Sequence, residues 1–206
     1  MPKALSEGER AHIQKRLMEE AEACLFKYGV RKTTVDELVR RVRIPKGTFY
    51  LFYESKELLF YDVLLAFHEE IQGMLMERLQ SLAQAVTPDT MTDVIFGLYR
   101  KVEASFLYPL MMNGEIELLM QKLSPEIIKA HVHTDDLQVE QLVRLVPNIS
   151  AERVPCFSAA LRAIFLSMLH KREVGEDVFE KALYILLRGT VVQMFERKAE
   201  DHDQGQ

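Results

Sequence analysis

The sequence contains no tryptophan, only two cysteines, and no continuous apolar run long enough to cross a membrane. A transmembrane helix needs about 20 consecutive apolar residues, so the missing run argues against a membrane-spanning protein. Cys24 and Cys156 are far apart in the chain and match no metal-binding or redox spacing. We interpret both as small buried apolar residues in a reducing cytosol. Because no basic segment followed by an apolar stretch opens the chain, we expect a cytoplasmic protein without a secretion signal.

Sequence motifs of common enzyme classes are also absent. The chain has no glycine-rich phosphate loop, no nucleophile elbow and no paired metal-ligand motif. His131, His133 and Asp135 could be taken for a metal site, but an i, i+2 spacing directs side chains to different sides of a helix. A hydrolytic or acyl-transfer enzyme would need Cys24 or Cys156 beside a histidine, and both cysteines lie in apolar helical stripes. We therefore expect no metal, no cofactor and no enzymatic activity.

Charge is distributed unevenly along the 206 residues. The chain has a formal net charge of -5, yet its first 60 residues contain 12 Lys/Arg and 9 Asp/Glu, a net charge of +3. The remaining residues therefore carry a net charge of -8. A basic first quarter joined to an acidic remainder is typical of a protein that contacts nucleic acid with one end, although three excess charges are a modest signal.

Apolar residues recur along the chain at intervals of three and four, which is the spacing of one helical face. Start signals accompany several of these patterns, such as Ser6 with Glu9 and the sequence Ser124-Pro125-Glu126. Gly29 stands where a helix-ending glycine is expected. We therefore predict an all-α fold. The expected helices run from the Ser6 cap to about residue 28, at 34–42, 45–52 and 55–82, from 88 onward, at 107–123 with a break at 113–114, and at 125–145, 151–172 and 176–198.

The stretch Thr33–Lys56 predicts two short helices joined by a tight turn. Thr34 and Glu37 have the spacing of a capping box, so a helix is expected to begin there. Pro45 ends this helix, because the residue before a proline is disfavoured in the α region, and it suits the first turn of the next one. Phe49 would pack inward and leave polar side chains outward. Such a helix can enter the major groove of DNA; the alternative is an ordinary helical hairpin whose aromatic residues only fill a core.

Three separate segments of this region resemble one known family in their order and spacing. They are Gly29–Leu38 (GVRKTTVDEL), Pro45–Tyr50 (PKGTFY) and Ser55–Leu59 (SKELL). Over about residues 9–60 the chain is similar to the N-terminal domain of TetR-family transcriptional regulators. Two residues depart from the family pattern. Arg43 stands in place of a turn glycine, so a strained φ angle is expected there, and Tyr53 stands in place of phenylalanine and adds a hydroxyl that must find a partner.

The resemblance implies a three-helix, helix-turn-helix DNA-binding domain in residues 1–54 and a larger helical ligand-binding and dimerisation domain in residues 55–206. Lys56 is similar to a phosphate-contacting lysine of the family, and Tyr50 to a tyrosine whose hydroxyl reaches the DNA backbone. Thr48 and Lys46 are the candidates for contacts with base edges. Thr34 has a structural alternative as the cap of its helix. The predicted DNA-binding residues are Thr33, Thr34, Lys46, Gly47, Thr48, Tyr50, Leu51, Phe52 and Lys56.

The helices beyond residue 60 contain methionines and aromatic residues that would suit a flexible apolar or aromatic ligand. A few polar residues among them could orient it. The alternative is that the same side chains form plain core. The predicted ligand-binding residues are Phe67, Phe96, Tyr99, Glu103, Phe106, Met111, Met112, His131 and Met168.

The last two expected helices carry more apolar residues than one buried seam requires. The resemblance implies that they pair with their copies in a four-helix bundle about a twofold axis. Gly189 would let a neighbouring helix approach closely. The predicted dimer-interface residues are Phe157, Leu161, Ile164, Phe165, Leu183, Leu187, Val191 and Met194.

We therefore interpret the chain as a homodimeric, sequence-specific DNA-binding transcriptional regulator. We expect a repressor that leaves a palindromic operator when a small ligand binds its C-terminal domain. The helix from residue 55 to about 82 would connect the two domains as one rod about 37 Å long. The alternatives are a helical ligand- or partner-binding protein that has lost DNA binding, and a small-molecule enzyme with a helical pocket.

Overall fold

The structure is a computed structural model that describes the backbone of residues 5–81 and 86–196. Within these ranges it also describes all side chains except those of residues 79, 81 and 130–138. Every regular element in the described residues is helical, as the sequence predicted. None of these helices has the length and apolar character needed to span a membrane.

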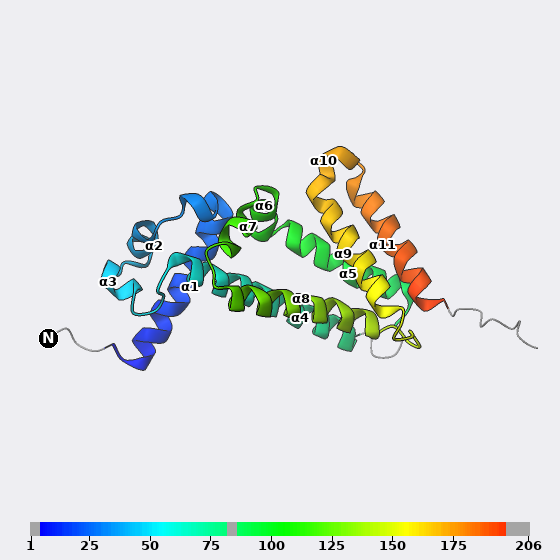
Figure 1. Cartoon of the computed structure of the whole chain (residues 1–206), viewed down its shortest axis with the longest axis horizontal. Helices are drawn as coiled ribbons and strands as arrows, with labels where there is room; N and C mark the ends of the chain where they lie inside the picture. The colour runs from blue at the N-terminus through cyan, green and yellow to red at the C-terminus, as the bar shows by residue number, and fades with distance from the viewer. Residues whose placement is uncertain (1–4, 82–85, 197–206) are drawn as a thin grey trace, which may run out of the picture. The chain divides into compact units, whose positions relative to one another are not determined.

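The chain forms two compact units, each built from two stretches of sequence (Figure 1). The first comprises Met1–Met74 and Arg100–Ile128, and the second comprises Leu75–Tyr99 and Lys129–Gln206. Three helices contribute to both units: α4 (Lys56–Ser81), α5 (Pro88–Glu103) and α8 (Pro125–Arg144). These units are groups of residues that pack together, and their boundaries are not those of the predicted functional domains. The division into a DNA-binding domain at 1–54 and a ligand-binding domain at 55–206 stays a prediction.

The first unit is assembled around α1 (Glu7–Lys32), which contacts α2 (Val35–Val42), α6 (Leu107–Met112) and α7 (Glu115–Met120). The short α3 (Lys46–Phe49) packs on α2. Helix α1 begins with the predicted capping box, in which Ser6 and Glu9 bond to each other's backbone amides. The fully or almost fully buried side chains of this unit include Leu17, Ala21, Cys24, Leu25, Leu38, Phe49, Leu59 and Phe60.

Gly29 interrupts α1 near its end. Its φ of 74° and ψ of -176° lie in a region that is essentially restricted to glycine, so the helix proper ends there and residues 30–32 form a separate turn. The helix end predicted near residue 28 is therefore confirmed. The break predicted at Asn113-Gly114 is also confirmed, because Gly114 adopts a left-handed conformation between α6 and α7.

In the second unit α9 (Val154–Leu166) packs against α11 (Phe179–Phe195). A 3-10 turn (Ser167–His170) and the short α10 (Lys171–Val174) connect them. The prediction of one helix over 151–172 was wrong, because the chain leaves α geometry at Ser167. The predicted helix 176–198 starts three residues later, at Phe179, and its last two residues lie outside the described part.

Two further expectations need correction. The helix predicted at 45–52 has α geometry only over Lys46–Phe49, with Pro45 as its N-cap rather than its first residue. Cys24 is buried as expected, and burial raises the pKa of its thiol. Cys156 is exposed, because it lies on the outer side of α9.

Candidate nucleic-acid interface

Helices α2 and α3 form the predicted helix-turn-helix. Thr34 caps α2, and its side chain accepts a hydrogen bond from the Glu37 amide at 3.2 Å. Arg43 closes α2 in the left-handed conformation, with φ 62° and ψ 46°. The strained φ angle expected at this position is therefore confirmed. Pro45 is the N-cap of α3, so the two short helices and the turn between them lie within residues 35–49.

A buried aromatic side chain fixes α3 on the rest of the unit. Phe49 is fully buried, and its ring packs edge-on against Tyr50, with 5.3 Å between the ring centroids. Burying a phenylalanine contributes roughly 1.5–3 kcal/mol, which is enough to hold a helix that is too short to be stable alone. Because Phe49 points inward, the neighbouring side chains of α3 are directed outward.

The outward side of α3 carries most of the predicted DNA-binding residues. Tyr50 is 50% exposed and Leu51 61% exposed, and Lys46 and Gly47 are exposed as well. A Cβ atom at Gly47 would meet nothing within 4 Å, so the glycine leaves open space above the helix. Thr48 is half-buried.

Lys46 has an intramolecular partner in the free protein. Its ammonium group lies 2.9 Å from the Asp36 carboxylate of α2, and this contact raises the pKa of the lysine. Both side chains are more than half exposed, and exposed ion pairs contribute little to stability. The lysine can therefore leave Asp36 for a more favourable anionic partner.

Three of the predicted residues have structural contacts. Thr33 is fully buried and donates a hydrogen bond to the Gly29 carbonyl at 2.7 Å. Phe52 is half-buried beneath the guanidinium of Arg10, which lies 5.2 Å from the ring centroid. The ammonium of Lys56 donates to the backbone carbonyls of Val30 and Thr33.

The segment between α1 and α2 is also held from α7. The Glu115 carboxylate accepts a hydrogen bond from the Val30 amide, and the space beside Gly29 is filled by the same carboxylate. A side chain at Gly29 would collide with it. Sequence reasoning missed Glu115, because no local pattern links residues 85 positions apart.

Ion pairs of Arg41 connect α2 to α1. Arg41 donates to Glu37 at 2.6 Å and to Glu20 of α1 at 3.4 Å. The hydrogen bond that Arg41 donates to Glu37 raises the pKa of the Arg41 guanidinium. Beside these ion pairs lies a second feature that the sequence did not reveal, a basic hollow of about 440 Å³ next to the helix-turn-helix turn. Its lining residues are His12, Ile13, Arg16, Arg41, Val42 and Arg43.

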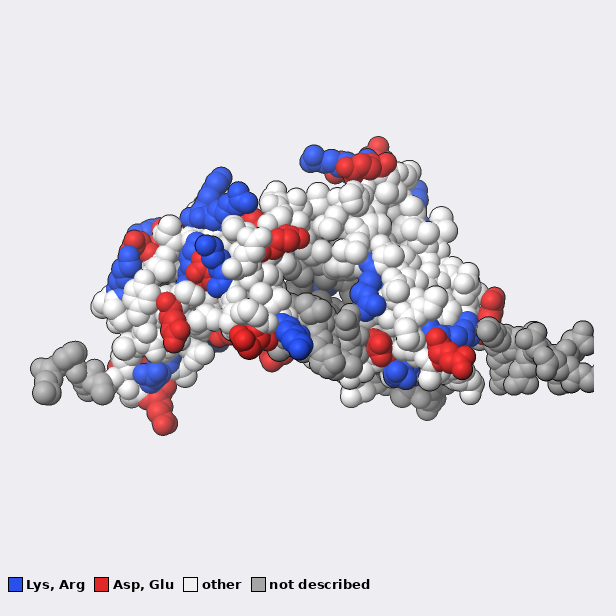
Figure 2. All heavy atoms as spheres, viewed as in Figure 1, with Lys and Arg blue, Asp and Glu red and all other residues white. Residues whose placement is uncertain are grey.

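Charges of both signs are mixed on the face of the first unit that Figure 2 shows. Lys and Arg side chains alternate there with Asp and Glu rather than forming one continuous basic patch. This agrees with the small net charge of the first 60 residues. DNA affinity must then depend on the placement of individual side chains more than on a strong overall field.

The hydroxyl of Tyr53 has found protein partners. Tyr53 is 6% exposed, and its hydroxyl lies 3.6 Å from the Met18 sulfur. Burial and the neighbouring Asp62 carboxylate raise the pKa of Tyr53 to about 12. The residue that departs from the family pattern therefore belongs to the domain core and not to the outer face.

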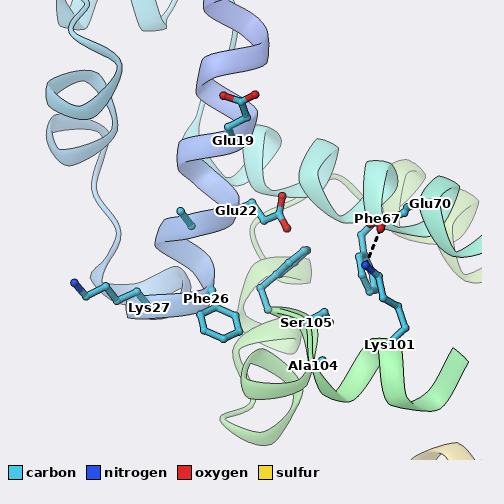
Figure 3. A pocket seen from close by; sticks show the side chains of 11 residues that line it. Glu19, Glu22, Phe26, Lys27, Phe67, Glu70, Lys101, Ala104 and Ser105 are labelled. Carbon is cyan, nitrogen blue, oxygen red and sulfur yellow. Dashed lines mark ion pairs between the residues drawn. The ribbon is translucent and has the colours of Figure 1, made fainter. Parts of the chain in front are cut away.

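The predicted ligand-binding residues are divided between the two units. Phe67 and Phe106 lie together in the first unit, with 5.4 Å between their ring centroids, and both line a pocket of about 650 Å³ (Figure 3). Tyr99 is buried in the second unit and donates to the Leu161 carbonyl at 2.7 Å. Of the remaining residues, Met168 is buried, Glu103 and Met111 are half-buried, and Met112 is 40% exposed. The ring of Phe96 packs edge-on against that of Tyr184. The side chain of His131 lies outside the described residues.

The predicted dimer residues lie on α9 and α11, which pack against each other within the chain. Seven of them are at most 9% exposed, and Phe165 is half-buried against Tyr99. Such side chains leave almost no surface for a partner. The exposed apolar residues of the same two helices are Leu166, Ile185 and Leu186, with 52%, 70% and 51% of their surface exposed.

The helix-turn-helix, whose second helix is anchored by Phe49 and exposes Lys46, Gly47 and Tyr50, has the architecture of a DNA-binding motif. Residues 17–63 match the sequence model described as bacterial regulatory proteins, tetR family. Residues 17–63 therefore correspond to the N-terminal domain of TetR-family regulators, and the chain is a DNA-binding transcriptional regulator. No curated protein sequence matches it.

Solved structures agree with this fold. A protein from Mesorhizobium loti described as a TetR-family transcriptional regulator is similar with a TM-score of 0.67 at 15% identity, covering 89% of this chain and 95% of that one. The TetR-family repressor FadR from Thermus thermophilus, in complex with lauroyl-CoA, has a TM-score of 0.55 at 20% identity, covering 91% and 97%. RolR in complex with resorcinol has a TM-score of 0.50 at 16% identity, covering 93% and 99%.

Proposed function

We propose that the protein is a cytoplasmic repressor without enzymatic activity that binds a palindromic DNA operator as a homodimer. The observation that carries the proposal is the outer face of α3, where Lys46, Gly47 and Tyr50 are exposed around the buried anchor Phe49. A helix held in this way can enter the major groove without losing its packing.

The contacts with DNA divide by chemistry. Lys46 and Thr48 are the candidates for base edges, because both can reach the groove from the start of α3 and carry hydrogen-bond donors. Tyr50 and Thr34 are the candidates for phosphate contacts, which position the protein without reading sequence. The open space above Gly47 supports a close approach of the helix to DNA. Thr33 is not among these contacts, because its side chain is fully buried.

The dimer surface that the structure favours is the outer side of α9 and α11. Leu166, Ile185 and Leu186 are exposed there, and a Cβ atom at Gly189 would meet nothing within 4 Å. Exposed apolar residues on two adjacent helices are typical of a homodimer interface. Twofold pairing would set two copies of α3 on the two halves of a palindrome.

We further propose that a small molecule releases the protein from DNA. Two proteins of similar fold were solved with small molecules bound, resorcinol in RolR and lauroyl-CoA in the repressor FadR. Release requires a ligand that prefers the conformation with low DNA affinity, and DNA must then lower the ligand affinity by the same factor.

The proposal is tested by titrating a fluorescent duplex that spans the DNA flanking the protein's own gene, at two salt concentrations, against an unrelated duplex. We expect tighter binding to the flanking DNA, by an even number of protomers, and a loss of affinity at higher salt. Equal affinity for both duplexes, followed by no enriched sequence when genomic fragments are selected for binding, would favour the alternative of a helical protein that has lost DNA binding.

Two substitutions make this test specific. Lys46→Met should weaken binding to the specific duplex by about five-fold or more, since a good base-edge contact contributes about 1–3 kcal/mol. Lys129→Met removes the same charge from an exposed position on α8 and should leave the affinity unchanged. If both variants bind as the unmodified protein does, α3 does not read the DNA.

The dimer is tested by analytical ultracentrifugation. Ile185→Glu places a charge on the proposed surface and should convert dimers into monomers. Val174→Glu makes the same kind of change at an exposed apolar residue of α10 and should leave the dimer intact. A monomeric unmodified protein, or a dimer that survives Ile185→Glu, would contradict the assignment of this surface.

A further inference from the structure

The pocket of about 650 Å³ in the first unit is not explained by DNA binding. It is lined by α1, α4, the end of α5 and the residues that follow it (Figure 3). All of its lining residues belong to one compact unit. Its volume falls in the range of about 300–1,000 Å³ that is usual for small-molecule sites.

Aromatic and small side chains form the apolar part of the pocket. Phe67 and Phe106 are buried and pack edge to face, and Ala23 and Ala104 leave room beside them. Phe26 of α1 also lines the pocket, and it is 59% exposed, which is unusual for so large an apolar side chain. A ligand with aromatic groups would cover Phe26 and rest against the two buried rings.

The charged groups around this apolar surface do not balance. Lys101 and Glu70 neutralise each other across 2.7 Å. Lys27 extends away from the pocket in Figure 3, and its ammonium lies 5.2 Å from the ring centroid of Tyr28. Glu22 extends from α1 toward the pocket and forms no ion pair with any residue that the structure describes. The charge left facing the pocket is therefore negative.

We propose that this pocket binds an amphipathic organic cation, a molecule with one or two aromatic groups and a protonated amine. The aromatic groups would lie against Phe26 and the Phe67–Phe106 pair, and the ammonium would meet Glu22. The Glu22 carboxylate disfavours an organic anion. Glu19 contributes further negative charge to the pocket lining, because the only ion pair described for Glu19 is an exposed contact with Lys15 at 3.9 Å. The proposal adds a ligand class and a location to the proposed function, and its binding assay contains no DNA, so either can fail without the other.

The experiment compares three probes of nearly equal size by isothermal titration calorimetry at pH 7. They are 3,3-diphenylpropylammonium, the neutral 3,3-diphenylpropanol and the anionic 3,3-diphenylpropanoate. We expect the cation to bind about five-fold more tightly than the alcohol and the anion to bind most weakly. The preference for the cation should decline as salt is raised, because the site is open to solvent.

Substitutions then locate the site. Glu22→Gln should weaken the cation about five-fold and leave the alcohol unchanged, and Phe26→Ala should weaken both. Glu69→Gln removes a carboxylate from an exposed position on α4 outside the pocket and should change neither affinity. Both glutamates are exposed, so circular dichroism should show unchanged helix content. Equal affinity for the three probes, no measurable binding of any of them, or a cation preference that survives Glu22→Gln would each overturn the proposal.

Discussion

The ammonium group of Lys56 lies 2.6 Å from the backbone carbonyl of Thr33 and donates a hydrogen bond to it. The same group donates to the Val30 carbonyl at 2.8 Å. Lys56 is the first residue of α4, and the two carbonyls belong to the segment that leads from α1 into α2. One side chain therefore ties the start of α4 to the entrance of the helix-turn-helix.

This geometry gives Lys56 a positioning role that differs from the phosphate contact implied by the family resemblance. Lys56→Met keeps the aliphatic chain and removes both hydrogen bonds. We expect the free energy of unfolding to fall by about 1–3 kcal/mol, the usual contribution of hydrogen bonds to a charged group. DNA affinity should fall as well, because α2 and α3 lose their fixed position.

The slope of log affinity against log salt concentration separates the two roles. Loss of a phosphate contact lowers this slope by about 0.9, whereas loss of positioning leaves it unchanged. The measurement is a salt series for the unmodified protein and for Lys56→Met, with Lys122→Met at an exposed position as the control. A lower slope together with unchanged stability would show that Lys56 contacts phosphate.

Gly29 should not tolerate alanine. Its φ of 74° and ψ of -176° are reached at low energy only by glycine, and an added Cβ would meet the Glu115 carboxylate. We expect Gly29→Ala to lower the free energy of unfolding by more than about 2 kcal/mol, measured by urea denaturation.

A second variant separates backbone strain from collision. Combined with Glu115→Ala, Gly29→Ala should cost less than the sum of the two single changes, because only the collision is relieved. Strict additivity of the two changes would show that Glu115 does not press against residue 29.

Whether a feature could be predicted from the sequence depends on how far apart in the chain the interacting residues lie. Gly29, Arg43 and the break at Asn113-Gly114 were predictable, because caps, turns and backbone preferences involve residues only a few positions apart. The contact between Glu115 and Val30 depends on how α7 packs on α1, and no local pattern contains that information. Lys56 was recognised by its position in a motif, but its hydrogen-bond partners were set by tertiary packing.

The apolar stripes of the last helices show the same limit. Periodicity placed Phe157 and Leu161 on an apolar face of one helix and Leu183 and Leu187 on an apolar face of the next, and all four are buried. It could not say whether the face packs on a helix of the same chain or on a partner, since both give the same pattern. The structure buries these residues within the single chain, in two helices that contact each other, and leaves Ile185 exposed.

Arg43 is a site where a substitution should stabilise the protein. Its left-handed conformation, with φ 62° and ψ 46°, costs a non-glycine residue roughly 1 kcal/mol. We expect Arg43→Gly to raise the free energy of unfolding by up to about 1 kcal/mol, with Arg43→Asn between the two and Arg43→Ala giving no gain. Chemical denaturation of the four proteins gives the order directly, and a loss of stability in Arg43→Gly would mean that the arginine side chain contributes more than the strain costs.

Glu37 should make the stability of the DNA-binding domain depend on pH. Hydrogen bonds from Arg41 and Arg40 lower the pKa of its carboxyl below the ordinary value of 4.5 in the folded state. Its contribution is therefore complete above pH 4.5 and is lost as the pH falls below that value through the lower folded pKa. Glu37→Gln should be less stable than the unmodified protein at pH 7, and the difference should shrink below pH 4.5. Urea denaturation across this range measures it, and a difference that stays constant with pH would exclude the ionised carboxylate as the cause.

The last prediction concerns the ion pair between Lys46 and Asp36 at 2.9 Å. In the free protein Asp36 competes with DNA for the lysine, and its own charge repels phosphate. Asp36→Asn removes both effects, so we expect DNA affinity to rise about three- to ten-fold while stability changes little, because exposed ion pairs contribute about 0–1 kcal/mol. Fluorescence anisotropy measures the affinity with and without Lys46→Met. If competition for the lysine is the cause, Asp36→Asn should raise the affinity less in the Lys46→Met protein. An equal rise in both proteins would reduce the role of Asp36 to general repulsion and would show that Lys46 is not held back from DNA by its partner.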